Sequence, residues 1–154
     1  MRRHILYIIA ALMVMAISSC DSGMSYDHYN SVSVEGWNRT DTLHFSPGKL
    51  PSGNYAIDVG FRATEAYPYR ELGLQIEWTV FPRGKNTAKK IKCEVFDSEG
   101  RMEGTQSVSS SDFLFHAGDV ALRSGDSLAV TVTHCMNRDV MPGLTSVGIQ
   151  VRER

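Results

Sequence analysis

Residues 72–80 read Leu-Gly-Leu-Gln-Ile-Glu-Trp-Thr-Val, with an apolar side chain at every second position. Successive side chains of a β-strand point to opposite faces of the sheet. This segment is therefore predicted to be a strand that buries one face and exposes the other. The buried set is Leu72, Leu74, Ile76, Trp78 and Val80.

The same alternation recurs along the chain. Tyr55, Ile57, Val59 and Phe61 alternate with smaller or polar residues, and further strands are predicted at 91–96, 112–116, 128–136 and 145–152. Weaker candidates lie at 31–34 and 41–45, and turns rich in Gly, Pro, Ser and Asp separate the segments. About eight short strands and no capped helical period predict an all-β fold, a single antiparallel β-sandwich over residues 26–154. A barrel is the second choice.

The N-terminus has the features of an export signal. Arg2 and Arg3 precede an apolar run at residues 5–17, and Ser18-Ser19-Cys20 follows. This order predicts a cleaved lipoprotein signal peptide at residues 1–19, with lipid attached to Cys20. Residues 20–25 are then a short tether between the lipid and the folded domain, and the protein is expected at a membrane surface of the cell envelope.

Charge argues against a nucleic-acid partner. The chain has 16 basic and 17 acidic residues, and removal of Arg2 and Arg3 with the signal peptide leaves 14 against 17. A slightly acidic chain with mixed signs offers no electrostatic footprint for a phosphate backbone. The densest basic segment, residues 85–92, is interpreted as the solvated end of a hairpin.

Two cysteines remain beside Cys20. Cys93 and Cys135 could form one disulfide in an oxidising compartment, or they could be two separate buried thiols that pack as small apolar groups. The sequence does not place their Cα atoms, so both interpretations stay open.

Catalytic and metal-binding patterns are missing from the sequence. His28, His44, His116 and His134 show no metal-ligand spacing, and no phosphate-binding loop or nucleophile elbow occurs. We therefore expect no enzyme activity, no cofactor and no metal. An envelope hydrolase would require a cleft with a histidine within hydrogen-bond reach of a serine or a carboxylate.

Four aromatic residues are candidates for contact with a partner or a glycan. Tyr29 and Trp37 lie near the start of the domain, and Tyr67 and Tyr69 flank Pro68 between two predicted strands. Exposed aromatic rings are common at binding surfaces, but they also pack over the ends of sandwiches. A surface carbohydrate-binding module is the alternative function, and it requires exposed, roughly coplanar rings.

Several motifs together resemble the gliding-motility lipoprotein GldH family. They are Cys20-Asp21 followed by Tyr26-Asp27-x-Tyr29, the Tyr67-Pro68 segment before an apolar strand, Phe81-Pro82-x-Gly84, Asp97-x-x-Gly100-x-x-x-Gly104, and Gly143-Leu144-x-x-Val147-Gly148. The last motif is the most specific. One departure is Asn137, which stands between Met136 and Arg138 where the family usually has adjacent Met and Arg.

The resemblance implies a lipoprotein that is an accessory component of the gliding motility and type IX secretion machinery. It implies partners among other motility or secretion lipoproteins, and placement at the outer membrane rather than the inner membrane. It carries over no catalytic residues.

Overall fold

The computed structural model describes residues 23–154, which contain β-strands, connecting loops and no helix. The longer strands are β1 (Met24–Ser31), β3 (Leu43–Lys49), β4 (Gly53–Ala63), β5 (Glu71–Phe81), β6 (Lys85–Glu94), β8 (Ser111–Leu122), β9 (Ser127–His134) and β11 (Leu144–Glu153). Three strands have two residues each: β2 (Trp37–Asn38), β7 (Thr105–Gln106) and β10 (Val140–Met141). No helix in this part of the chain is long and apolar enough to cross a bilayer. The predicted signal peptide and Cys20 lie outside the described residues.

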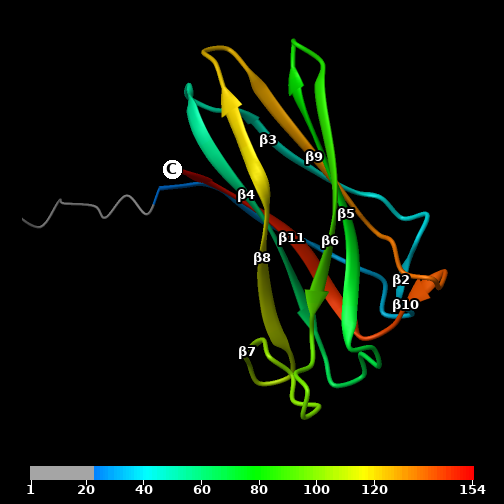
Figure 1. The fold of residues 1–154 in the computed structure, drawn as a ribbon. Helices are drawn as coiled ribbons and strands as arrows, with labels where there is room; N and C mark the ends of the chain where they lie inside the picture. The colour runs from blue at the N-terminus through cyan, green and yellow to red at the C-terminus, as the bar shows by residue number, and fades with distance from the viewer. Residues whose placement is uncertain (1–22) are drawn as a thin grey trace, which may run out of the picture.

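The strands form two antiparallel sheets that pack face to face (Figure 1). One sheet has the order β1-β11-β4-β8-β7, and the other has the order β3-β9-β5-β6. β2 and β10 form a separate small pair. Neighbours in each sheet run antiparallel, which confirms the predicted all-β sandwich.

The core lies between the sheets and is built from the alternating segments. The facing side chains of β4 and β5 are all buried, and they are Tyr55, Ile57, Val59, Phe61, Leu72, Leu74, Ile76, Trp78 and Val80. Full burial of a large apolar side chain stabilises a fold by about 1.5–3 kcal/mol. This apolar layer is therefore the main force that holds the two sheets together.

Two edge strands begin earlier in the chain than predicted. β1 starts at Met24, inside the predicted tether, because it pairs with β11 from Met24 opposite Arg152 onward. β6 starts at Lys85, although the alternation in the sequence begins only near residue 91. The lysines of β6 are exposed, and lysine on an edge strand discourages other strands from adding to it. The lysine-rich segment is thus a protected strand and more than the end of a hairpin.

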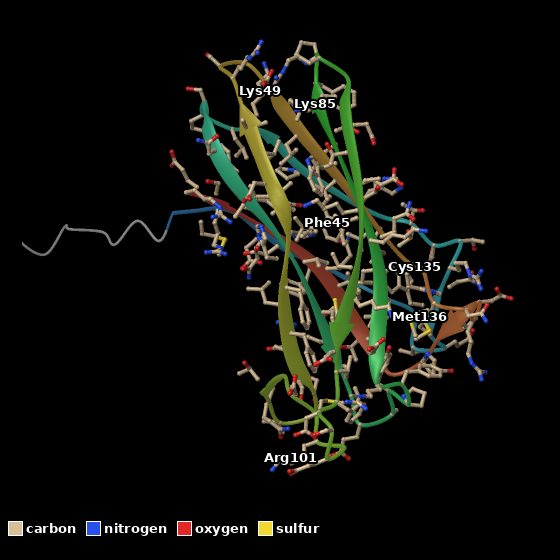
Figure 2. The ribbon with its side chains drawn as sticks, viewed as in Figure 1. Phe45, Lys49, Lys85, Arg101, Cys135 and Met136 are labelled. Carbon is tan, nitrogen blue, oxygen red and sulfur yellow. The ribbon has the colours of Figure 1, made fainter. Side chains whose placement is uncertain are left out.

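The disulfide that the sequence left open does not form. Cys93 lies opposite Leu72 on one side of β5, and the Cys135 N–H donates to the Gly73 carbonyl from the other side at 2.9 Å. A whole strand separates the two backbones by about 10 Å at ordinary strand spacing, which is too far for a disulfide. Both thiols are free; Cys93 is buried, and Cys135, which is labelled in Figure 2, is exposed. Burial, and to a lesser extent the nearby Cys135, raise the pKa of the Cys93 thiol to about 12.

The outer face of the five-stranded sheet carries an aromatic ring laid across two glycines. Tyr29 of β1 lies over Gly148 of β11 and Gly60 of β4, and a Cβ atom on Gly148 would lie 2.5 Å from the Tyr29 ring. The Arg62 guanidinium also lies over the ring, with its Cζ 5.1 Å from the ring centroid. Only a residue without a side chain leaves room for this ring, so the glycines determine where Tyr29 packs.

We expect Gly148→Ala to destabilise the fold by about 1–3 kcal/mol, because the new methyl group overlaps the Tyr29 ring. Tyr29→Ala in the same chain removes the overlap, so the double variant should lose less than the sum of the two single changes. Urea unfolding of the four proteins measures this coupling. Additive losses would show that the ring does not meet the glycine as described.

Candidate partner-binding edge

The sandwich has four sheet edges, and three of them are protected. β6 carries exposed lysines, and β3 contains Pro47, which has no N–H to offer a new strand. β1 lies against β3, where the Asn30 side chain donates to the His44 carbonyl at 3.2 Å. The fourth edge, at β8, has no lysine or proline of its own. A β-bulge at Ala117 interrupts it, and Lys89 of β6 lies close to Gly118, so the unprotected part is the segment before the bulge.

We define the open edge as the part of β8 from residue 113 to residue 116, before the bulge. β7 pairs with β8 only at Ser111 and Asp112, and no other strand of the described chain pairs with this side of β8. The open edge begins with Phe113-Leu114-Phe115, and Leu114 is 49% exposed. A strand edge that is apolar and free of lysine is a template for strand addition.

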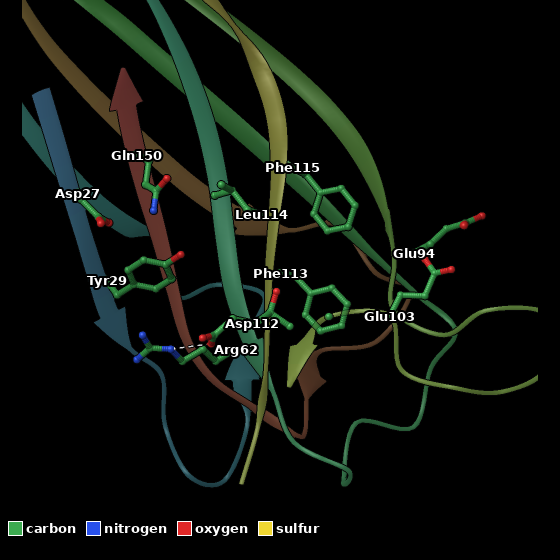
Figure 3. A pocket seen from close by; sticks show the side chains of 12 residues that line it. Asp27, Tyr29, Arg62, Glu94, Glu103, Asp112, Phe113, Leu114, Phe115 and Gln150 are labelled. Carbon is green, nitrogen blue, oxygen red and sulfur yellow. Dashed lines mark hydrogen bonds and ion pairs between the residues drawn. The ribbon is translucent and has the colours of Figure 1, made fainter. Parts of the chain in front are cut away.

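A hollow of about 650 Å³ surrounds the start of the open edge. Figure 3 shows that it extends to both sides of β8. Leu114 lies with Tyr29 and Gln150 on one side, and Phe113 and Phe115 point toward Glu94 and Glu103 on the other. Phe61 stacks on Phe113 with ring centroids 4.8 Å apart, so the floor of the hollow is part of the core.

The wall of the hollow is acidic. Its carboxylates belong to Asp27, Glu94, Glu103 and Asp112. Arg62 is the cation among the lining residues, and its Nε is 2.8 Å from the Asp112 Oδ1. Burial and the nearby Asp27 raise the pKa of Tyr29, so its hydroxyl stays protonated at neutral pH. A cationic segment therefore suits this hollow better than an anionic one.

Two of the four predicted contact residues are buried. Trp37 is 0% exposed and its Nε1 donates to the Asp41 carbonyl at 2.8 Å. Tyr67 is 1% exposed and its hydroxyl donates to the Glu71 carbonyl at 2.8 Å. Their polar tips reach backbone carbonyls, which lets the rings pack in the core. The prediction that these two rings are exposed contacts is wrong.

The other two rings are partly covered. Tyr69 packs against Tyr67 at an interplanar angle of 81°, and Arg138 lies 5.6 Å from its ring centroid. Tyr29 packs on Gly60 and Gly148 and is contacted by Arg62. The four residues therefore supply no exposed, coplanar platform. The carbohydrate-binding alternative required such a platform and is not supported by these rings.

One histidine does reach a carboxylate. The Nδ1 of His116 lies 2.9 Å from the Oδ1 of Asp58, which is buried on the outer face of the five-stranded sheet. Arg152 also binds Asp58, with its Nε 3.0 Å from the Oδ2. The other His116 nitrogen faces the Asp119 carboxylate at 3.6 Å rather than a hydroxyl. The group is an ion-pair network with no nucleophile in contact with the histidine.

His134 belongs to the core instead. It is 2% exposed, its Nε2 lies 3.1 Å from the Trp37 carbonyl, and its ring meets the Trp37 ring edge-on. Burial lowers its pKa, which favours the neutral ring. Within residues 23–154 no three His, Cys, Asp or Glu side chains form a cluster that could hold a metal ion.

The alternation of apolar residues does not reveal the open edge. Phe113, Leu114 and Phe115 are consecutive apolar residues and so break the alternation that marks a strand with one buried face. That break was the available signal, but a buried strand has the same appearance. Only the sheet order shows that this strand lies at an edge.

Comparison with protein families gives one match over nearly all of the described chain. A family model described as GldH lipoprotein matches residues 24–151. No curated protein matches the chain.

Solved structures give distant likenesses. A GH115 4-O-methyl-α-glucuronidase is 13% identical over 82% of this chain, with a TM-score of 0.45, and this chain spans only 16% of its length. Eiger TNF from S. frugiperda is 12% identical over 83% of this chain and 92% of its own, with a TM-score of 0.33. A pentameric capsid protein from metagenomic phage sequences is 18% identical over 92% of this chain and 72% of its own, with a TM-score of 0.31. Likenesses at these scores carry no information about function.

The burial of His134 predicts a pH dependence of stability. The unfolded chain takes up a proton at this residue near the ordinary histidine pKa of 6.5, whereas the folded protein resists protonation until lower pH. The free energy of unfolding should therefore decrease as the pH falls below about 6.5. Urea unfolding between pH 7.5 and pH 5 should show a smaller decrease in His134→Gln, which retains a donor for the Trp37 carbonyl. An equal pH dependence in both proteins would contradict this assignment.

Proposed function

Since the chain belongs to the GldH lipoprotein family, we propose that it is a non-enzymatic accessory component of the gliding motility and type IX secretion machinery. In this proposal a signal peptide at residues 1–19 is removed, and Cys20 carries the lipid, including a palmitoyl chain. The lipid holds the domain on a membrane of the cell envelope, and we place it at the outer membrane. The family match and the N-terminal sequence support this assignment.

The open edge of β8 is the observation that carries the proposed role. An accessory protein acts by holding other proteins, and its contact surface should be stable when free and able to accept a partner. β8 is held on one side by a ladder with β4 that runs from Ser111 to Leu122 and is interrupted by one β-bulge at Ala117. Its other side has backbone groups that can pair with an incoming strand.

The lining of the hollow indicates the chemistry of the partner. An added strand would place alternate side chains on the two sides of the sheet. Apolar side chains would cover Leu114 and Phe115, and lysine or arginine would meet Glu94, Glu103 or Asp27. We therefore propose an extended segment of another envelope protein, apolar with basic residues nearby, as the occupant.

The absence of catalysis remains part of the proposal. The His116 ring is bounded by the carboxylates of Asp58 and Asp119, and this arrangement supports a structural ion pair over a general base. The pair between Asp58 and Arg152 fits the same role, since it neutralises a buried carboxylate.

We expect Leu114→Lys to reduce partner recovery at least about tenfold, because a lysine on an edge strand opposes strand addition. The measurement is affinity purification of the full lipoprotein from its own membrane after mild cross-linking, with quantitative mass spectrometry. Val34→Lys is the matched control, because Val34 is a fully exposed valine in the loop after β1, away from β8.

Two outcomes would contradict the proposal in different ways. Equal recovery of partners with Leu114→Lys and Val34→Lys would remove the open edge as the contact surface. Recovery of no motility or secretion protein with the unchanged protein, at normal expression, would remove the accessory role itself.

A further inference from the structure

The end of the sandwich where the chain leaves toward Cys20 is well defined. The Glu153 N–H donates to the Gly23 carbonyl at 2.9 Å, and Met24 lies opposite Arg152. The Arg154 N–H donates to the Asn54 carbonyl at 2.9 Å. The start of β1, the end of β11 and the start of β4 therefore meet at one end of the five-stranded sheet.

Three turns lie at this same end. Lys49 of β3 is opposite Ser127 of β9, and Gly53 of β4 is opposite Leu122 of β8. The β3–β4 and β8–β9 turns therefore lie side by side. Arg83 of the β5–β6 turn donates to the Ala121 carbonyl at 3.2 Å. We define the tether end as residues 49–53, 81–85, 121–127 and 153–154. Figure 1 shows the three turns together, with the loops at 64–70 and 95–110 at the opposite end, which we call the far end.

The tether is short compared with the length of the domain. Cys20 lies three residues before Gly23, and an extended chain spans at most about 3.5 Å per residue, so the reach is about 10 Å. β8 alone has 12 residues, which at about 3.3 Å per residue is about 40 Å. A lipid on Cys20 therefore keeps the tether end close to the membrane, and the contacts made at that end decide how the domain is oriented.

The two ends differ in charge. The tether end carries Lys49, Arg83, Lys85, Arg123 and Arg154 against Asp126 and Glu153. Arg83 is paired with Asp126, and Arg154 is paired with Asp119. The far end carries Glu65, Asp97, Glu99 and Glu103 against Arg70 and Arg101. Figure 2 shows Lys49 and Lys85 near one end and Arg101 at the other.

We infer that the tether end is a membrane-contact surface that binds anionic lipid headgroups through Lys49, Lys85 and Arg123. These side chains are exposed and have no carboxylate partner among the ion pairs of the described residues. Phe81 at the same end is 49% exposed and offers an apolar contact at the headgroup level. Each cation near an anionic surface strengthens the attraction about fivefold. The inference rests on the proposed lipid at Cys20.

The consequence is a fixed orientation. The tether end faces the lipid, and the acidic far end, with the start of the open edge beside it, points away from the membrane. A partner would then reach β8 without competing with the lipid surface.

The test uses the full lipidated protein in vesicles of phosphatidylglycerol and phosphatidylcholine that contain a headgroup spin label. A fluorophore is attached at Ser124→Cys or at Ser98→Cys in a Cys135→Ser background, which removes the exposed thiol. Both serines are exposed in tight turns, one at each end. We expect at least about twofold stronger quenching at position 124 than at position 98. Raising the salt to about 0.5 M should reduce this difference, because it screens surface charges.

Lys49→Glu/Lys85→Glu should abolish most of the difference on phosphatidylglycerol vesicles. The matched control is Lys90→Glu/Lys92→Glu, which makes the same charge change on exposed lysines in β6 away from the tether end. Equal quenching at positions 124 and 98 in the protein with unchanged lysines, with lipid on Cys20 verified by intact mass, would overturn the membrane-contact inference and leave the proposed lipid anchor in place. A mass without lipid would instead overturn the proposed anchor, and the inference with it.

Discussion

Each strand of a β-sheet has backbone donors and acceptors on both sides, and a sandwich that does not close into a barrel must leave some of them without a strand partner. This constraint accounts for much of the surface of the protein. The lysines of β6, Pro47 in β3 and the packing of β1 against β3 each protect an edge. β8 is the strand whose edge keeps apolar residues and lacks such protection, over residues 113–116 between its pairing with β7 and the bulge at Ala117.

The five-stranded sheet also buries polar groups on its outer face. Asp58 is 2% exposed and is held by His116 and Arg152, while Tyr29 fills the space that Gly60 and Gly148 leave open. A buried carboxylate without a partner would destabilise the fold by several kcal/mol. These ion pairs therefore offset the desolvation penalty of Asp58 and add little net stability. The Tyr29 ring on the same face forms part of the hollow beside β8.

The charge distribution and the point where the chain leaves the domain support each other. The net charge of the whole chain is −1, but cations gather near Gly23 and carboxylates gather at the far end. A short tether at the basic end and an acidic hollow next to the open edge divide the surface between lipid and protein partners. Neither feature is visible in the overall composition, because the opposite charges nearly cancel.

The sequence by itself determined the all-β class, because the alternation at residues 55–62 and 72–80 requires one buried face on each strand. It also carried the family motifs and the predicted lipid anchor. Only the tertiary structure decided which aromatic rings are buried, because Trp37 and Tyr67 find backbone carbonyls that come from the folded chain. It likewise separated Cys93 from Cys135 by inserting β5 between them. The open edge of β8 depends on the order of strands in the sheet, which is set by contacts between segments far apart in the chain. Local periodicity of apolar residues does not predict such contacts.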